Sequence, residues 1–170
     1  MVEIKRQFEK AYEDYANAIF RHCYFRVHDR ERAKELVQEV FTKTWQYLAQ
    51  GHTIDNIRAF LYRVAHNLIL NEWRKQSEAS LDSMSEDEGF DPQNDDDLKI
   101  VSDADAGILM KYLDKLPKRN RDVIVMRYID EMGVNEIAAV TGESVNVISV
   151  RIHRTLKQLK TILQEYENRA

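Results

Sequence analysis

The chain contains few of the residues that interrupt or cross-link secondary structure. Its 170 residues include 5 Gly, 2 Pro and a single cysteine, Cys23. So few turn-forming residues argue against an all-β protein and favour helices. A lone cysteine cannot form an internal disulfide, and this fits a reducing, cytoplasmic compartment.

Long apolar runs are also missing from the sequence. No stretch has the length and apolar character needed to span a bilayer, so we expect no membrane insertion. Residues 1–6 do not begin an apolar stretch of the kind found in signal peptides. Both observations again predict a cytoplasmic protein.

The chain has no overall excess of positive charge, because its formal net charge is −4. Residues 1–76 nevertheless have a net charge of +3 (13 basic, 10 acidic), and residues 106–170 also have +3 (11 basic, 8 acidic). Residues 77–105 have −10 (1 lysine, 11 acids) and few large apolar side chains. The sequence therefore predicts two domains, 1–76 and 106–170, joined by a flexible acidic linker that is either a plain tether or an active element.

Apolar residues recur at helical spacing through residues 1–76, and three helices are expected there. The first ends near Val27, the second covers about residues 30–49, and the third runs to about Lys75. Either Asp55 or Asn56 would cap the third helix. Cys23 falls on the apolar stripe of the first helix, which indicates a packed thiol and not a metal ligand.

The second domain has the pattern of four helices. They are expected around residues 108–113, from Pro117 to about Arg127, over residues 135–140, and from about Ser144 to Tyr166. Gly142 lies between the last two, where a tight turn with positive φ suits glycine. This is the pattern of a helix-turn-helix, although an ordinary helical hairpin is the alternative.

The side of the last helix opposite its apolar stripe has side chains suited to DNA. These offer base-edge hydrogen bonds, contacts to thymine methyl groups and positive charge for phosphates. The candidate residues are Asn146, Ser149, Val150, Arg151, His153, Arg154 and Lys157. We find no phosphate loop, nucleophile elbow or zinc spacing, so neither an enzyme nor a cofactor is expected.

Several further motifs follow one another through both domains: residues 36–41 with Trp45, residues 56–61, residues 65–68 and the run 116–154. The first three resemble region 2 of an extracytoplasmic-function sigma factor of the sigma-70 family, and the run is similar to region 4. The resemblance implies an all-α subunit that directs bacterial core RNA polymerase to promoters. The alternative is a stand-alone helix-turn-helix regulator, whose first domain would serve dimerisation or effector binding.

The resemblance also assigns roles to individual residues. Those implied to dock on the β′ clamp helices are Glu35, Gln38, Glu39, Thr42 and Lys43. Those implied to contact the −10 element are Arg58, Arg63, His66, Asn67, Asn71, Arg74 and Lys75. Asn67 would contact an extruded base, and residues 50–56 would form part of its pocket.

In the second domain, the resemblance implies contacts to the β flap and to the −35 element. Many relatives have a basic residue at the position of Ser149 and a serine at the position of Val150, so the −35 sequence itself is not assigned. An anti-sigma factor is also an expected partner.

Overall fold

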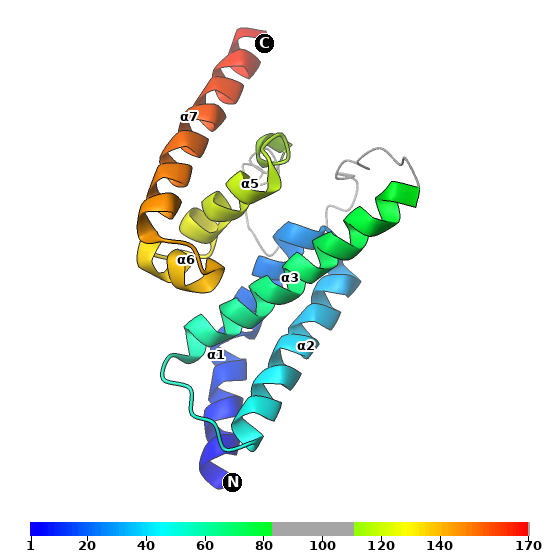
Figure 1. Ribbon diagram of the computed structural model, residues 1–170, viewed down its shortest axis with the longest axis vertical. Helices are drawn as coiled ribbons and strands as arrows, with labels where there is room; N and C mark the ends of the chain where they lie inside the picture. Colours follow the sequence, from blue (N-terminus) through cyan, green and yellow to red (C-terminus); the bar gives the residue numbers. More distant parts are fainter. Residues whose placement is uncertain (83–110, 170) are drawn as a thin grey trace. The chain divides into compact units, whose positions relative to one another are not determined.

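The computed structural model describes residues 1–82 and 111–169 (Figure 1). Within these ranges all regular secondary structure is helical, which confirms the predicted all-α class. The chain divides into two compact units, one mainly of residues 1–82 and the other mainly of residues 111–169, with residues 138–142 grouped with the first. No helix of the described ranges has both the length and the apolar character to cross a membrane.

The N-terminal unit consists of three helices, α1 (Val2–Val27), α2 (Arg30–Ala49) and α3 (Ile57–Asp82). Each helix packs against the other two, and Figure 1 shows α2 and α3 side by side. Apolar residues from all three are buried in the core; they include Ile19, Cys23, Leu36, Val40, Leu61 and Ile69. The three predicted helices are thus confirmed.

Side-chain caps define where two of these helices begin. The Asp29 side chain accepts a hydrogen bond from the Arg32 backbone N–H at 3.1 Å, at the start of α2. At the start of α3, Asn56 Oδ1 accepts from the Ala59 N–H at 3.0 Å. Asn56, and not Asp55, is therefore the cap, because it satisfies a backbone donor that has no partner within the helix.

The helix α3 extends beyond the end that the sequence predicted. It continues to Asp82, so residues 77–82 of the expected linker are helical. The predicted helix end near Lys75 was wrong because charge pattern alone does not end a helix, and Glu78 and Ala79 are good helix formers. The remainder of the predicted linker, residues 83–105, lies outside the described residues.

The C-terminal unit begins with helical residues 111–113. After Pro117 follow α5 (Lys118–Ile124), the π-helical turn η2 (Val125–Ile129), α6 (Val134–Thr141) and α7 (Val145–Arg169). The helices α5 and α7 pack against each other. The buried residues include Leu113, Val123, Met126, Ile148 and Leu159. The last three predicted helices are confirmed in their order, whereas residues 108–110 of the first lie outside the described residues; the π-helical turn was not expected.

The turn between α6 and α7 has the geometry predicted for it. Gly142 has a φ of 76°, and its N–H donates to the Ala138 carbonyl at 2.9 Å. Two residues later, Ser144 Oγ accepts from the Val147 N–H at 3.2 Å and caps α7. A residue with a Cβ atom would be strained at Gly142, so this glycine ends α6 and allows the chain to enter α7.

Candidate nucleic-acid interfaces

The outer side of α2 presents the residues expected to meet the polymerase. Buried residues from Ala33 to Leu48 define its inner side. Glu35, Gln38, Thr42 and Lys43 are exposed, and Glu39 is half-buried. Residues 35, 38, 39 and 42 follow helical spacing, so four of the five predicted residues share one face and the fifth lies beside it.

The exposed face of α3 is a row of basic and amide side chains. Arg63, Asn67, Asn71 and Arg74 are all exposed and recur at steps of three or four residues. Such steps align them along one side of the helix, with Lys75 next to the row. We call these five residues the α3 row. The helix brings its members together on one side, and their contact with the −10 element stays a prediction.

Two other residues assigned to the −10 element lie differently. His66 is only 5% exposed and belongs to the inner side of α3 with Leu61 and Ile69, so its assignment as a DNA contact is corrected to a core residue. Arg58 is half-buried, and its guanidinium carbon lies 5.7 Å from the centroid of the Tyr62 ring. The side chain of Arg58 therefore packs on the helix from which it extends.

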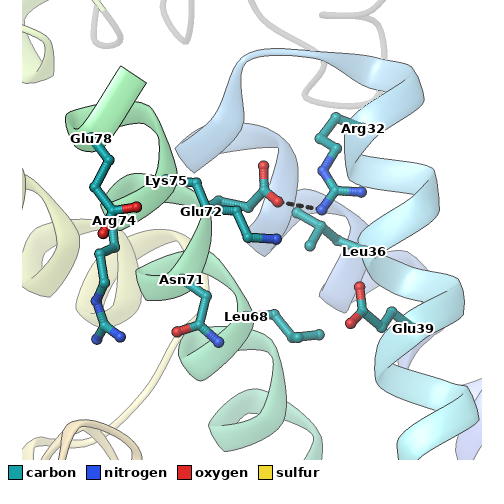
Figure 2. Close-up of a pocket in the computed structure, with 9 residues that line it drawn as sticks. All are labelled: Arg32, Leu36, Glu39, Leu68, Asn71, Glu72, Arg74, Lys75 and Glu78. Atoms are coloured by element: carbon teal, nitrogen blue, oxygen red, sulfur yellow. Dashed lines mark hydrogen bonds and ion pairs between the residues drawn. The ribbon is translucent and has the colours of Figure 1, made fainter. Parts of the chain in front are cut away.

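A cavity of about 190 Å³ lies between α2 and α3, beside the α3 row (Figure 2). Arg32 of α2 donates one hydrogen bond to Glu72 of α3 and another, of 2.7 Å, to the exposed carboxylate of Glu35. The bond from Arg32 holds the pKa of Glu72 below its ordinary range. In Figure 2, Arg74 points away from this pair. The cavity thus contains the ion pair of Arg32 and Glu72, while Arg74 extends to solvent.

The loop that precedes α3 is held by aromatic rings that the sequence reasoning did not single out. The rings of Tyr47 and His52 stack with centroids 4.4 Å apart, and those of Tyr47 and Phe60 lie 4.9 Å apart. Gly51, with φ 88°, allows the sharp exit from α2. Phe60 and Asn67 are seven residues apart, about two helical turns, so the ring stack and Asn67 lie on the same side of α3.

The exposed face of α7 contains nearly all of the residues predicted to enter the −35 groove. Asn146, Ser149, Val150, His153, Arg154 and Lys157 are exposed. The opposite side is buried through Ile148, Ile152, Thr155 and Leu159. The helix is therefore divided into an inner apolar side and an outer polar side.

Arg151 is the exception on α7. It is half-buried, and its two terminal nitrogens both donate to the carboxylate of Glu143, with Nη2 3.0 Å from Oε1. The hydrogen bonds from Arg151 to Glu143 raise the pKa of the guanidinium further, so this group is always charged. Its side chain is directed to the turn between α6 and α7.

Comparison with known proteins gives the same two-part division. Residues 11–79 match the family described as Sigma-70 region 2, and residues 106–159 match Sigma-70 region 4. The chain belongs to the extracytoplasmic-function sigma factors of the sigma-70 family. It is an RNA polymerase sigma factor, and members of this family are regulatory subunits and not enzymes.

Relatives match nearly the whole sigma factor. It is 28% identical to RNA polymerase sigma factor YlaC of Bacillus subtilis over 89% of each chain. It is 27% identical to the ECF sigma factor SigW of the same species, over 96% of this chain and 94% of the relative. Because both domains match, a stand-alone helix-turn-helix regulator is not favoured.

Solved structures share the fold. The sigma factor RpoE from Bartonella quintana, solved with the anti-sigma factor NepR, superposes with a TM-score of 0.75 at 20% identity, covering 94% of this chain and 98% of that one. CnrH, solved with the cytosolic domain of CnrY, superposes with a TM-score of 0.70 at 22% identity, covering 95% and 90%.

Proposed function

We propose that this sigma factor reads a two-part promoter, with the α3 row at the −10 element and α7 at the −35 element. The observation that carries the proposal is the α3 row itself, in which two amides, Asn67 and Asn71, lie between cations along an exposed helix face. Amides can hydrogen-bond base edges, and cations can hold the phosphates on either side.

Asn67 would contact a base extruded from the −10 element. Extrusion costs the base its pairing and stacking, on the order of a few kcal/mol, and contacts to the extruded base must offset this cost. Asn67 is exposed and has Arg63 one turn before it and Asn71 one turn after it. The ring stack of Tyr47, His52 and Phe60 would stabilise the neighbouring loop, which supports residues 50–56 as one wall of the pocket.

The outer face of α7 would enter the major groove of the −35 element. Asn146, His153, Arg154 and Lys157 supply hydrogen-bond donors and positive charge, and Val150 supplies an apolar contact for a thymine methyl group. The positive-φ turn at Gly142 and the cap at Ser144 support this use, because they define where the helix starts.

The outer face of α2 would dock on the β′ clamp helices, and the C-terminal unit on the β flap. The α2 face is solvent-exposed and has charges of both signs on Glu35, Glu39 and Lys43. Such a face suits a polar helix–helix contact whose register depends on charge complementarity. An anti-sigma factor is proposed as a further partner, since the RpoE structure of similar fold was solved with one.

The test uses core RNA polymerase purified from the bacterium that encodes the chain. The reconstituted holoenzyme selects duplexes from a random-sequence library, and the enriched duplexes are transcribed with and without the sigma factor. We expect two conserved elements at fixed spacing and transcription that core enzyme alone does not perform. Equal enrichment by core enzyme alone would refute the proposal.

A further inference from the structure

The contact between Glu143 and Arg151 joins the helix-turn-helix turn to the middle of the recognition helix. Glu143 directly follows Gly142, whose φ is 76°. Arg151 lies within α7, which begins at Val145. Both terminal nitrogens of Arg151 engage the Glu143 carboxylate, and this two-point arrangement restricts orientation as well as distance.

The position of Arg151 on α7 differs from that of the groove-facing residues. Asn146, Val150, His153 and Lys157 follow steps of four, three and four, so they share one face. Arg151 is instead one turn from the buried residues Ile148 and Thr155, and is itself half-buried. A side chain held there is directed to the protein more than to the groove.

A second carboxylate also acts on the guanidinium of Arg151. Asp122 of α5 acts on the guanidinium through its charge and is itself buried. Because α5 and α7 pack against each other, Arg151 interacts with both the turn and α5. Arg151 thus links α7 to the preceding turn by hydrogen bonds and to α5 by charge.

We infer that Arg151 is a positioning residue that, with Glu143, sets the orientation of α7 for the −35 element, and that it is not a DNA contact. The inference rests on the proposed use of α7 in promoter reading. If Arg151 positions α7, then Glu143 contributes to promoter binding, although it is an acid close to the expected DNA surface. A direct phosphate contact by Arg151 would make the same acid a competitor of the DNA.

The experiment measures the affinity of reconstituted holoenzyme for two labelled duplexes. One is a duplex enriched by the wild-type holoenzyme, and the other is the same duplex with its −35 element scrambled. The variants are Arg151→Lys, Glu143→Gln and the double substitution. Lys157→Gln is the matched control, because Lys157 is an exposed cation on the groove-facing side.

Positioning predicts that Arg151→Lys loses affinity for the enriched duplex although its charge remains, because lysine cannot make the two-point contact. The loss should be roughly fivefold to tenfold, the range for one charge-assisted contact at a partly exposed site. Glu143→Gln should show a similar loss, and the double variant no more than either single one. Affinity for the scrambled duplex should not change in any of the three.

The control should behave in the opposite way. Lys157→Gln should weaken both duplexes about equally, as expected for removal of a phosphate contact. Wild-type affinity in Arg151→Lys, or a gain in Glu143→Gln, would overturn the inference alone. Should the wild-type holoenzyme enrich no −35 element, the proposed function fails and the inference fails with it. Thermal melting of each variant separates these results from simple unfolding, which would lower both affinities together.

Discussion

The two units hold their candidate DNA-facing residues in different ways. In the N-terminal unit, the ion pair between Arg32 and Glu72 joins two separate helices beside the α3 row. In the C-terminal unit, the ion pair between Glu143 and Arg151 joins one helix to its own preceding turn. The position of the α3 row therefore depends on how α2 and α3 pack. The position of the exposed face of α7 depends on where that helix starts.

This difference matches the tasks proposed for the two units. Capturing an extruded base requires groups from more than one element, and α3 and the ring-supported loop supply them. Reading an intact major groove requires one well-oriented helix.

The largest effect is expected from the core of the N-terminal unit. Leu61 is 0% exposed, so Leu61→Ala should lower the free energy of unfolding by about 2–5 kcal/mol. Both tryptophans, Trp45 and Trp73, lie in this unit, so denaturation followed by tryptophan fluorescence reports on it. Leu70→Ala, on the same helix but 40% exposed, is the matched control and should change stability much less. Equal losses in the two variants would mean that α3 does not pack as described.

The next largest effect tests the base contact. Asn67→Ala should reduce promoter opening about 10-fold to 100-fold, the discrimination that one good amide–base contact supplies. Permanganate reactivity of unpaired thymines in the −10 element measures opening. Asn17→Ala, at an exposed asparagine on α1, is the control and should open promoters normally. Ser149→Ala on α7 should affect binding of the closed duplex more than opening. Normal opening by Asn67→Ala would mean that Asn67 does not hold an extruded base, and the two units would then not differ in this task.

Local chemistry explains how much of this fold could be predicted. The helices follow from apolar periodicity, and the turn at Gly142 from the steric freedom of glycine. The α3 row was also predictable, because residues on the outer side of an amphipathic helix are exposed wherever the helix packs. These features can be predicted because they depend only on residues close together in the sequence.

The missed features all depend on contacts between distant residues or on burial. The resemblance implied a DNA contact for His66, but its position one turn after the buried Tyr62 places it inside. Arg32 and Glu72 are 40 residues apart, and no spacing rule connects them. Arg151 has the residue type of a DNA contact. Only the structure shows that its guanidinium is held by Glu143.

The third prediction concerns the start of α3. Asn56→Ala should lower the stability of the N-terminal unit by about 1 kcal/mol, because the Ala59 N–H loses its acceptor. Asp55→Ala, at the neighbouring exposed position, is the control. Fluorescence-detected denaturation of both variants measures the difference. A greater loss in Asp55→Ala would assign the cap to the other residue.

The smallest expected effect is a pH dependence confined to the pair in Figure 2. The hydrogen bond from Arg32 lowers the pKa of Glu72 from its ordinary value of 4.5. A lowered carboxyl pKa in the folded state stabilises the fold above the ordinary pKa, and this stabilisation is lost as the pH falls through the lowered value. The stability difference between the wild type and Glu72→Gln should therefore be constant near neutral pH and shrink below pH 4.5.

The chain provides a matched control for this effect, because Arg32 also binds Glu35. The side chain of Glu35 is 63% exposed, against 14% for Glu72, so water screens the first pair far more than the second. Glu35→Gln should therefore lower the stability near neutral pH less than Glu72→Gln does. If Glu35→Gln and Glu72→Gln lose equal stability, the contact between α2 and α3 does not depend on the Glu72 carboxylate. The α3 row would then be positioned by apolar packing alone, whereas the start of α7 would still be positioned by the ion pair between Glu143 and Arg151.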